Sequence, residues 1–404
     1  MEIDKKTAIF TVCNVAYLDK VMVLAESLYM SNNIKINVFL FDKKREIFLK
    51  DDFWKIHWVE ELNVPDFEIL SFKYNIIELS TSLKPWLALK LLDSYSKVIF
   101  FDPDVMVLNS IQSIIENLEE HPVIITPHYF YPKSNGFADD SKIMRFGNYN
   151  LGFFAVNSSL DSKKFLSWWS ERLMLNCFDD AQFGIFTDQK WVTTAQCFFP
   201  FIHISYNPGL NIAYWNLDER SISLDENKKY IVNDDFPLIF FHFSSFNNKF
   251  PEKLSKNNFI IGNNTSSIIS NLAIDYSNQL NRYSTVSHDV TYSFDYMSKG
   301  KYISPTLRRA YASVLDLFPK GHNPFNEQGV VADFAKKNHL FEAKNKKYIA
   351  EGYQGLEDHS GKMKIIFSLM RLLLRIIGPN KFMSVSRLFV YLSSYHRVPK
   401  MWKI

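Results

Sequence analysis

The sequence predicts an α/β fold, in which a sheet is flanked by helices, followed by a mostly helical C-terminal extension. Up to about residue 250, short apolar runs alternate with segments of helical apolar spacing, which is typical of strands covered by helices on both faces. From Glu252 onward such runs become rarer, and Asn and Ser become dense. The chain has 404 residues, of which 47% are hydrophobic and 16% aromatic, so it can bury a sizeable core and is not intrinsically disordered.

Strands are predicted where β-branched and aromatic residues form runs of strand length. These runs are Ala8–Cys13, Ile36–Phe41, Val98–Phe101, Val123–Thr126, Gly152–Asn157 and Leu238–Phe243. The apolar spacing predicts helices at Tyr17–Met30, Lys84–Ser94 and Ser162–Leu175. In open sheets of this kind ligands bind at the carboxyl ends of the strands, so polar residues there are the first candidates for a site.

Three parts are expected: a sheet domain over residues 1–251, a helical, Asn- and Ser-rich extension over 252–360, and a basic amphipathic helical tail over 361–404. The tail contains nine Lys and Arg residues and no Asp or Glu, although the whole chain has a net charge of only +3. Arg371 and Arg375 interrupt an apolar run and share one helical face. We favour amphipathic helices lying on an anionic membrane surface, and a helical hairpin packed on the body stays the alternative.

Several classes of protein are excluded or disfavoured by what the sequence lacks. The N-terminus has no signal-peptide pattern, and no uncharged apolar stretch is long enough to predict a membrane-spanning helix. Three cysteines fit a reducing compartment. The GxxxxGK[ST], GxGxxG, HExxH and GxSxG motifs do not occur. The acidic body and the absence of a recognisable binding motif argue against nucleic acid.

The strongest local signal is KVIFFDPDVMVLNSI, in which a buried strand leads directly into Asp102, Pro103 and Asp104. Two carboxylates one residue apart at the end of a strand can hold a hard cation such as Mn²⁺ or Mg²⁺. Such an ion commonly bridges the diphosphate of a substrate. An ordinary acidic turn is the alternative interpretation.

His242 ends another apolar run in PLIFFHFSSFNNKF. A neutral imidazole there could be a third metal ligand, and a satisfied, half-buried histidine is the alternative. Lys249 follows seven residues later and could reach a phosphate.

Two further segments offer groups for a sugar. In GNYNLGFFAVN, Asn150 could hydrogen-bond sugar hydroxyls and Gly152 permits close backbone approach, although a turn entering a strand explains both. In FGIFTDQKWVTTA, Asp188 and Gln189 open a predicted helix. Asp188 is either its N-cap or, with Gln189, a polar pair acting on the reacting carbon or on an acceptor hydroxyl.

The order of these motifs resembles a known family. TAIFTVCNVAYLDKVMVLAESL, SLKPWLALKLLDSYSKVIFFDPDV, NYNLGFFAVN, DQKW, NPGLNIAYWNL and FFHFSSF follow one another over roughly residues 7–255. This succession is similar to that of bacterial glycosyltransferases of the GT-A fold, most nearly the family 8-like group related to glycogenin and the lipopolysaccharide galactosyltransferases. The histidine element departs from the family pattern, with Ser245 where the family has glycine and Lys249 one position late.

The resemblance implies a role for each matched residue. Asp102, Asp104 and His242 would hold Mn²⁺ (or Mg²⁺) on the donor's diphosphate, and Lys84 would lie near the donor sugar and phosphates. Asn150 and Gly152 would line the sugar pocket, and Asp188 and Gln189 would lie next to the anomeric carbon. The first strand end, with Thr11, Asn14 and Tyr17, would hold the base and ribose.

The expected function is therefore metal-dependent transfer of a sugar, hexosyl or related, from a nucleotide-diphosphate-sugar to a glycan or lipid-linked acceptor. A UDP-sugar is the first choice of donor, a retaining mechanism is favoured over an inverting one, and bacterial surface polysaccharide synthesis is the expected context. The expected location is cytoplasmic, peripheral on the inner face of the cell membrane. A non-catalytic carbohydrate-binding or scaffold protein on the same fold is the alternative, and a pyrophosphorylase is disfavoured because AIFTVCNVAYL has no Gly-rich phosphate loop.

Overall fold

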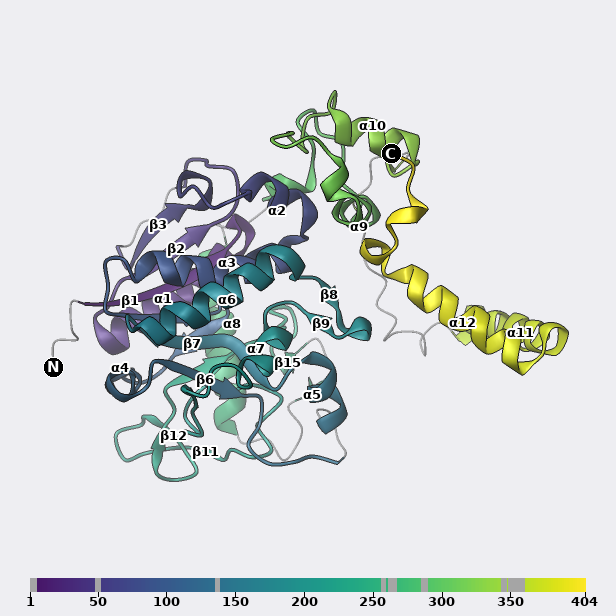
Figure 1. The fold of residues 1–404 in the computed structure, drawn as a ribbon. Coiled ribbons are helices and arrows are strands. Elements are labelled where there is room, and N and C mark those ends of the chain that lie inside the picture. Colours follow the sequence, from purple (N-terminus) through teal and green to yellow (C-terminus); the bar gives the residue numbers. More distant parts are fainter. Residues whose placement is uncertain are drawn as a thin grey trace. The chain divides into compact units, whose positions relative to one another are not determined.

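The computed structural model describes residues 6–47, 52–134, 139–255, 259–260, 267–284, 290–342, 347 and 360–404, and for residues 259–260 and 360–363 it describes the backbone alone. Much of the Asn- and Ser-rich stretch predicted within 252–360 lies outside these residues. Within the described chain, a mixed sheet is flanked by helices and the C-terminal part is helical (Figure 1). The predicted fold class is confirmed.

The chain divides into two compact units. The first comprises Met1–Phe67 and Ile76–Ser293, and the second comprises Glu68–Asn75 and Phe294–Ile404. The units reflect packing alone, and the division predicted at residues 251 and 360 stays a prediction.

A seven-stranded sheet with the order β10-β6-β7-β4-β1-β2-β3 forms the centre of the first unit. Its strands are β1 (Thr7–Cys13), β2 (Ile36–Leu40), β3 (Trp54–Trp58), β4 (Lys97–Phe101), β6 (Val123–Pro127), β7 (Tyr149–Asn157) and β10 (Ile202–Ile204). Neighbouring strands are parallel except at β7, which runs antiparallel to both β4 and β6. The carboxyl ends of β1 and β4 therefore meet at one edge of the sheet, where ligand sites form in such folds.

Shorter strands lie outside the large sheet. β5 (Val105–Val107) pairs antiparallel with β14 (Phe240–His242), β8 (Asp179–Asp180) with β9 (Ile185–Phe186), and β15 (Lys253–Ser255) with β16 (Phe259–Ile260). β11 (Ile222–Leu224), β12 (Tyr230–Val232) and β13 (Phe236–Pro237) form a three-stranded sheet.

Seven of the twelve described α-helices lie in the first unit. They are α1 (Leu18–Asn32), α3 (Ile76–Leu91), α4 (Gln112–Glu120), α5 (Asp140–Phe146), α6 (Leu160–Asn176), α7 (Gln189–Ala195) and α8 (Ser267–Tyr283). All residues of α2 (Phe67–Lys73) except the first belong to the second unit. The second unit contains α9 (Pro305–Ser313), α10 (Val330–Lys337), α11 (Ser360–Ile377) and α12 (Pro379–Ser393).

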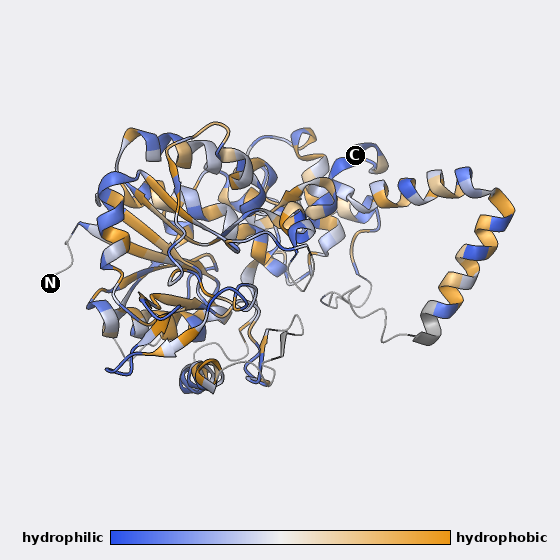
Figure 2. Cartoon of the chain, turned by 90° about the horizontal axis from the view of Figure 1, so that it is seen from below, coloured by the Kyte–Doolittle hydropathy of each residue, from blue (hydrophilic) through white to orange (hydrophobic). Residues whose placement is uncertain are grey.

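Helices cover both faces of the large sheet. Ile99 on β4 belongs to a buried cluster with residues of α1 and α4. Its neighbour Phe100 points to the other face, because successive strand residues alternate, and stacks on Phe154 with ring centroids 5.2 Å apart. Phe154 in turn meets Trp169 of α6, which lies beside α3 (Figure 1). Figure 2 shows the strands of this unit as mostly hydrophobic, as burial on both faces requires.

The predicted strands and helices all occur, with three differences in extent. α3 begins at Ile76 and runs through Pro85, whereas the predicted helix begins at Lys84. In the predicted helix Pro85 would lie in the first turn, where proline is well tolerated. β7 begins at Tyr149, before the predicted Gly152. The strand ending at His242 is shorter than predicted and pairs with β5.

β3 was not predicted. Its sequence, WKIHW, alternates apolar and polar residues, and only Trp54 and Trp58 are buried. It lies at the end of the sheet beside β2, so it lacks the continuous apolar run that identifies the central strands.

A buried arginine organises the second unit. Arg308, 3% exposed, donates hydrogen bonds of 2.9 Å to the carbonyl oxygens of Ser71, Phe72 and Tyr74. Phe72 packs edge-on against Tyr311, with ring centroids 4.8 Å apart. The segment Glu68–Asn75 is thereby held to α9.

The helices α11 and α12 expose many apolar side chains. Fourteen of these side chains are between 37% and 71% exposed: Ile365, Ile366, Phe367, Leu369, Met370, Leu372, Leu373, Leu374, Ile376, Met383, Leu388, Phe389, Val390 and Tyr391. Among the described residues, none of the helices combines the length and the apolar character that crossing a membrane requires.

Candidate active site

The predicted acidic motif lies at the carboxyl end of β4. β4 ends at Phe101, and the backbone N–H of Asp102 donates to the carbonyl oxygen of Gly152 on β7, at 2.8 Å. After Asp104 the chain continues as β5, whose register with β14 places His242 opposite Val105. Strand pairing between segments far apart in the sequence therefore brings His242 to the acidic motif.

Asp102, Asp104 and His242 form a cluster in which one ligand-type atom from each lies within 4.8 Å of the others. His242 Nε2 lies 3.1 Å from Asp104 Oδ1 and 3.9 Å from Asp102 Oδ2. Two carboxylates and an imidazole suit Mn²⁺, and the set is compatible with Mg²⁺. The donor set thus fits the ion that the sequence predicts.

The orientation of His242 is fixed by its other ring nitrogen. His242 Nδ1 lies 3.2 Å from Asn211 Oδ1, so that an N–H donated to this amide oxygen leaves the Nε2 lone pair facing the carboxylates. The ring is 3% exposed and packs edge-on against Trp215, with centroids 5.5 Å apart.

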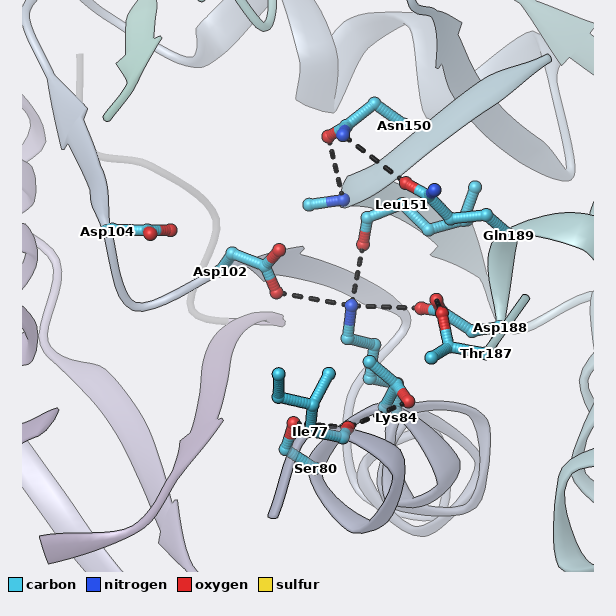
Figure 3. Close-up of polar contacts among 12 residues, drawn as sticks. Ile77, Ser80, Lys84, Asp102, Asp104, Asn150, Leu151, Thr187, Asp188 and Gln189 are labelled. Carbon is cyan, nitrogen blue, oxygen red and sulfur yellow. Dashed lines mark hydrogen bonds and ion pairs between the residues drawn. The ribbon is translucent and has the colours of Figure 1, made fainter. Parts of the chain in front are cut away.

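Lys84 links the acidic motif to the second predicted pair. Its ammonium lies 3.1 Å from Asp102 Oδ1 and 2.9 Å from Asp188 Oδ2, and it donates to the carbonyl oxygen of Leu151 at 3.0 Å (Figure 3). Burial alone would lower the pKa of Lys84, but Asp102 and Asp188 outweigh this effect and raise it. Lys84 is therefore a permanent positive charge between the two acids.

The two carboxyl groups of the motif differ in environment. Burial raises the pKa of Asp102, and the opposing attraction of Lys84 and His242 does not cancel it. Burial also favours a raised pKa for Asp104, but Lys20 and His242 outweigh it and hold the pKa of Asp104 well below its usual range. Asp104 is thus the carboxylate that stays charged under all ordinary conditions.

Asn150 and Gln189 face one another at the start of β7 and of α7. Asn150 Nδ2 donates to Gln189 Oε1 at 3.3 Å, and Asn150 Oδ1 accepts from the backbone N–H of Gly152 at 3.0 Å (Figure 3). Asn211 Nδ2 also donates to Asn150 Oδ1, at 3.1 Å. The amide network thereby joins the predicted sugar-contacting residues to the residue that orients His242.

Asp188 precedes α7, but its side chain makes no capping hydrogen bond. Its Oδ1 accepts from the hydroxyl of Thr187 at 3.1 Å, and its Oδ2 faces Lys84. Thr187 has a φ of 41°, in the left-handed region that a β-branched residue rarely adopts. Backbone strain of this kind persists where the surroundings enforce it, which is frequent at functional sites.

Thr11, Asn14 and Tyr17 lie at or just beyond the carboxyl end of β1, next to β4 in the sheet. Thr11 and Asn14 are buried, and the Thr11 hydroxyl has no hydrogen-bond partner within the part of the chain that the structure describes. Tyr17 is 43% exposed. The three side chains share an edge of the sheet with the acidic motif, and the Lys20 ammonium lies near both the Tyr17 ring and Asp104.

Lys249 lies in an exposed turn, where its backbone N–H donates to Asn247 Oδ1 at 3.2 Å. The role predicted for Lys249 stays a prediction. Besides Lys84, a second lysine lies beside the acidic motif: Lys20 of α1, whose ammonium lies 3.7 Å from Asp104 Oδ2. Sequence reasoning missed Lys20 and Asn211. Both residues lie inside segments that carry the family resemblance, Lys20 in TAIFTVCNVAYLDKVMVLAESL and Asn211 in NPGLNIAYWNL, but no local pattern in either segment marks the residue itself.

A cavity of about 300 Å³ opens near this edge, at the carboxyl ends of β6 and β10. Tyr129, Tyr149 and Tyr206 are among the residues that line it, together with Asp140 and Asn148. His128 lies between the lining residues Pro127 and Tyr129, and Asn216 Nδ2 donates to the carbonyl oxygens of both His128 and Asn211 at 3.1 Å. Asn216 therefore connects this segment to Asn211, the residue that orients His242.

The model of the nucleotide-diphospho-sugar transferase family matches residues 70–200. This range contains Lys84, both motif aspartates, Asn150 and Gly152, and the Asp188–Gln189 pair, but not His242. The match supports the predicted relation to nucleotide-sugar transferases over about a third of the chain.

Two curated proteins of Bacillus subtilis (strain 168) are similar to this chain. The uncharacterized protein YfnF is 27% identical over 151 residues, which are 37% of this chain and 50% of YfnF. The uncharacterized protein YfnD is 23% identical over 245 residues, which are 58% of this chain and 76% of YfnD. The match to YfnF thus spans half the length of that relative.

Solved structures of glycosyltransferases are among those that the fold matches. The galactosyltransferase LgtC in complex with donor and acceptor sugar analogs is 15% identical, with 67% of this chain and 95% of that chain covered and a TM-score of 0.39. The glycosyltransferase GlyE of Streptococcus pneumoniae TIGR4 is 15% identical, with 70% of this chain and 64% of that chain covered and a TM-score of 0.40.

Proposed function

We propose that this chain is a metal-dependent glycosyltransferase of the GT-A fold, related to the family 8 group. It transfers a hexosyl or related group from a nucleotide-diphosphate-sugar, with UDP as the first choice of nucleotide, to a hydroxyl of a glycan or lipid-linked acceptor. The expected context is the synthesis of a bacterial surface polysaccharide.

The observation that carries this proposal is the position of Lys84 between Asp102 and Asp188, for which we propose different roles. Asp102 belongs to the metal-type cluster, and Asp188 adjoins the Gln189 amide. The bond that a glycosyltransferase breaks joins a diphosphate to a sugar carbon. A site that holds the diphosphate at Asp102 and the sugar at Asp188 and Gln189 places this bond between them.

Asp102, Asp104 and His242 would hold Mn²⁺ or Mg²⁺. A divalent ion in such a site neutralises the negative charge that a departing diphosphate gains. Lys84 contributes positive charge beside Asp102, and Asn211 keeps the His242 ring in place. These groups are positioned before any substrate binds, which is what makes electrostatic stabilisation effective.

The surroundings of Asp188 favour a retaining mechanism. Both of its oxygens already have a partner, one in Thr187 and the other in Lys84, so an acceptor hydroxyl would have to compete with these contacts. A retaining transfer needs no strong base at this position. Gln189 and Asp188 would then act on the reacting carbon by polar contact, and Asp188 would be the first candidate base if the configuration is inverted.

The cavity near β6 and β10 supports the proposal that the acceptor is a glycan. Aromatic rings offer flat apolar faces for a sugar ring, and Asp140 and Asn148 offer groups that hydrogen-bond hydroxyls. The exposed apolar side chains and the cationic charge of α11 and α12 support a peripheral contact with an anionic membrane, where a lipid-linked acceptor would be found.

The proposal is tested by nucleotide release from a panel of UDP-, GDP-, dTDP- and CMP-sugars, first with Mn²⁺ and then with EDTA. We expect release from one donor that depends on Mn²⁺ and falls about 100-fold or more in Asp104→Asn. Asp93→Asn, an exposed carboxyl at the end of α3, is the matched control and should release nucleotide at the wild-type rate.

Full release by Asp104→Asn, or release that EDTA does not affect, would contradict the metal-dependent reaction. Binding of Mn²⁺ and a nucleotide diphosphate by calorimetry, without release from any donor or transfer to any glycan, would instead favour a non-catalytic carbohydrate-binding protein.

A further inference from the structure

Lys20 shares Asp104 with the predicted metal site. Its ammonium lies 3.7 Å from Asp104 Oδ2, whereas His242 Nε2 lies 3.1 Å from the other oxygen, Oδ1. The Lys20 and Asp104 side chains are only 17% and 14% exposed, so water screens this pair weakly. Asp104 thus faces His242, a predicted metal ligand, with one oxygen and the positive charge of Lys20 with the other.

The position of Lys20 is set by the packing of α1. Ser27 Oγ, two turns further along α1, accepts a hydrogen bond of 3.1 Å from the backbone N–H of Val107 on β5. This contact holds α1 along the strand that follows the acidic motif, so the first turn of the helix faces Asp104. Lys20 Nζ also lies 4.4 Å from the centre of the Tyr17 ring, a cation–π contact that keeps the ammonium at this edge.

We propose that Lys20 is an internal cation that couples binding of the divalent ion to binding of the donor's diphosphate. This inference rests on the proposed function for the identity of the anion. A divalent ion seated among Asp102, Asp104 and His242 would lie close to the Lys20 ammonium, and like charges at such distances repel. A diphosphate would offer oxygen ligands to the metal ion and accept hydrogen bonds from the Lys20 ammonium, and its negative charge would offset the repulsion.

Two opposite effects follow from this arrangement. Lys20 weakens the binding of the metal ion alone, because it already neutralises Asp104. Lys20 strengthens the binding of a diphosphate to the metal-loaded site, because it adds a positive donor. A lysine that merely held Asp104 in place would instead strengthen both.

The test uses Mn²⁺ and inorganic pyrophosphate, which carries the recognised group without a base or a sugar. The electron paramagnetic resonance signal of free Mn²⁺ gives the affinity for the ion in the full-length protein, with and without pyrophosphate. In Lys20→Met we expect Mn²⁺ alone to bind about 5-fold or more tighter and pyrophosphate to bind the metal-loaded protein about 5-fold or more weaker, shifts typical of coupled sites.

Two variants complete the design. Lys20→Arg keeps the charge and should retain the coupling, and Lys90→Met removes an exposed lysine of α3 and should bind both ligands as the wild type does. Thermal unfolding of each variant checks that it is folded. The Lys20→Gln substitution replaces Lys20→Met if the latter does not fold.

Unchanged affinities in Lys20→Met, or a loss of both affinities together, would overturn the proposal. It would also be overturned if the wild type bound neither Mn²⁺ nor pyrophosphate. If the two affinities shift in opposite directions but no sugar is transferred from any nucleotide-sugar, the coupling by Lys20 stands and the proposed glycosyltransferase function is refuted. The two failures are therefore distinguishable.

Discussion

Gly152 lies directly against the imidazole of His242. A β-carbon at position 152 would come within 2.4 Å of His242 Cε1 and 2.8 Å of Nδ1, closer than non-bonded carbons approach in proteins. Glycine at this position therefore makes room for the predicted metal ligand. The sequence indicates that Gly152 permits a close approach, and the structure identifies His242 as one group that makes it.

Gly152→Ala should displace the His242 ring. We expect Mn²⁺ affinity to fall about tenfold, as losses of positioning contacts around metal ligands typically do, with a loss of about 1–3 kcal/mol in the free energy of unfolding from overpacking. Calorimetry with Mn²⁺ and urea unfolding measure the two effects. In a His242→Ala background the same substitution should cost less stability, and the remaining cost would come from Asn150 Oδ1, which would lie 2.8 Å from the new β-carbon. An equal cost in both backgrounds would show that His242 is not the group that clashes.

Lys84→Met should destabilise the first unit by about 3–5 kcal/mol, because it leaves Asp102 and Asp188 without their buried counter-charge. Urea unfolding followed by tryptophan fluorescence measures the loss. Combining Lys84→Met with Asp188→Asn should recover part of it by removing one uncompensated charge. Equal stability of wild type and Lys84→Met would refute the interpretation of Lys84 as the centre of the charge network.

Acid should destabilise the protein through His128. Burial lowers the pKa of His128 to about 4. The nearby His242 also lowers this pKa, whereas hydrogen bonds with the backbone of Asn148 and Gly147 act in the opposite direction. An unfolded histidine binds its proton near pH 6.5, so between about pH 6.5 and 4 the unfolded chain binds more protons and stability falls as the pH falls.

His128→Gln should therefore flatten this part of the stability curve, measured by urea unfolding at successive pH values. Burial also lowers the pKa of His57 and His203, so a slope of the same sign remains. His339→Asn, at an exposed position, is the control. A slope unchanged by His128→Gln would show that this histidine is not held neutral.

The tail helices should bind anionic lipid vesicles. Arg371 and Arg375 lie one turn apart on α11, among exposed apolar side chains. We expect cosedimentation with phosphatidylglycerol-containing vesicles but not with phosphatidylcholine alone, and an affinity about tenfold or more lower in Arg371→Glu/Arg375→Glu, since each basic residue near an anionic surface contributes about 1 kcal/mol.

The matched control for the tail is Lys228→Glu/Lys229→Glu, which reverses two exposed charges of the first unit. It should bind vesicles as the wild type does. Equal losses in both double variants would indicate non-specific attraction by net charge, and no binding by the wild type would favour a helical hairpin with solvated arginines.

Much of the fold follows from the sequence because its signals are local. The central strands are predicted by continuous apolar runs, since both of their faces are buried, and the tail by its apolar spacing with regular arginines. The edge strand Trp54–Trp58 was missed because one strand partner and partial exposure permit an alternating pattern. The predicted helix Lys84–Ser94 covers only the second half of α3, which begins at Ile76 and contains Pro85 in its interior, where proline is normally unfavourable.

The sequence by itself determined the chemical types of the site: an acidic pair after a strand, a histidine after another, and an amide and an acid–amide pair at the starts of two elements. Only the tertiary structure decided which of them meet. The antiparallel pairing of β5 with β14 brings His242 to Asp104, α3 positions Lys84 between two acids, and α1 positions Lys20 beside Asp104. The physical reason is the distance along the chain over which each feature is decided. Strand length and helix spacing are set by neighbouring residues, whereas these contacts depend on how separate elements pair and pack: Asp104 lies 84 residues from Lys20 and 138 residues from His242.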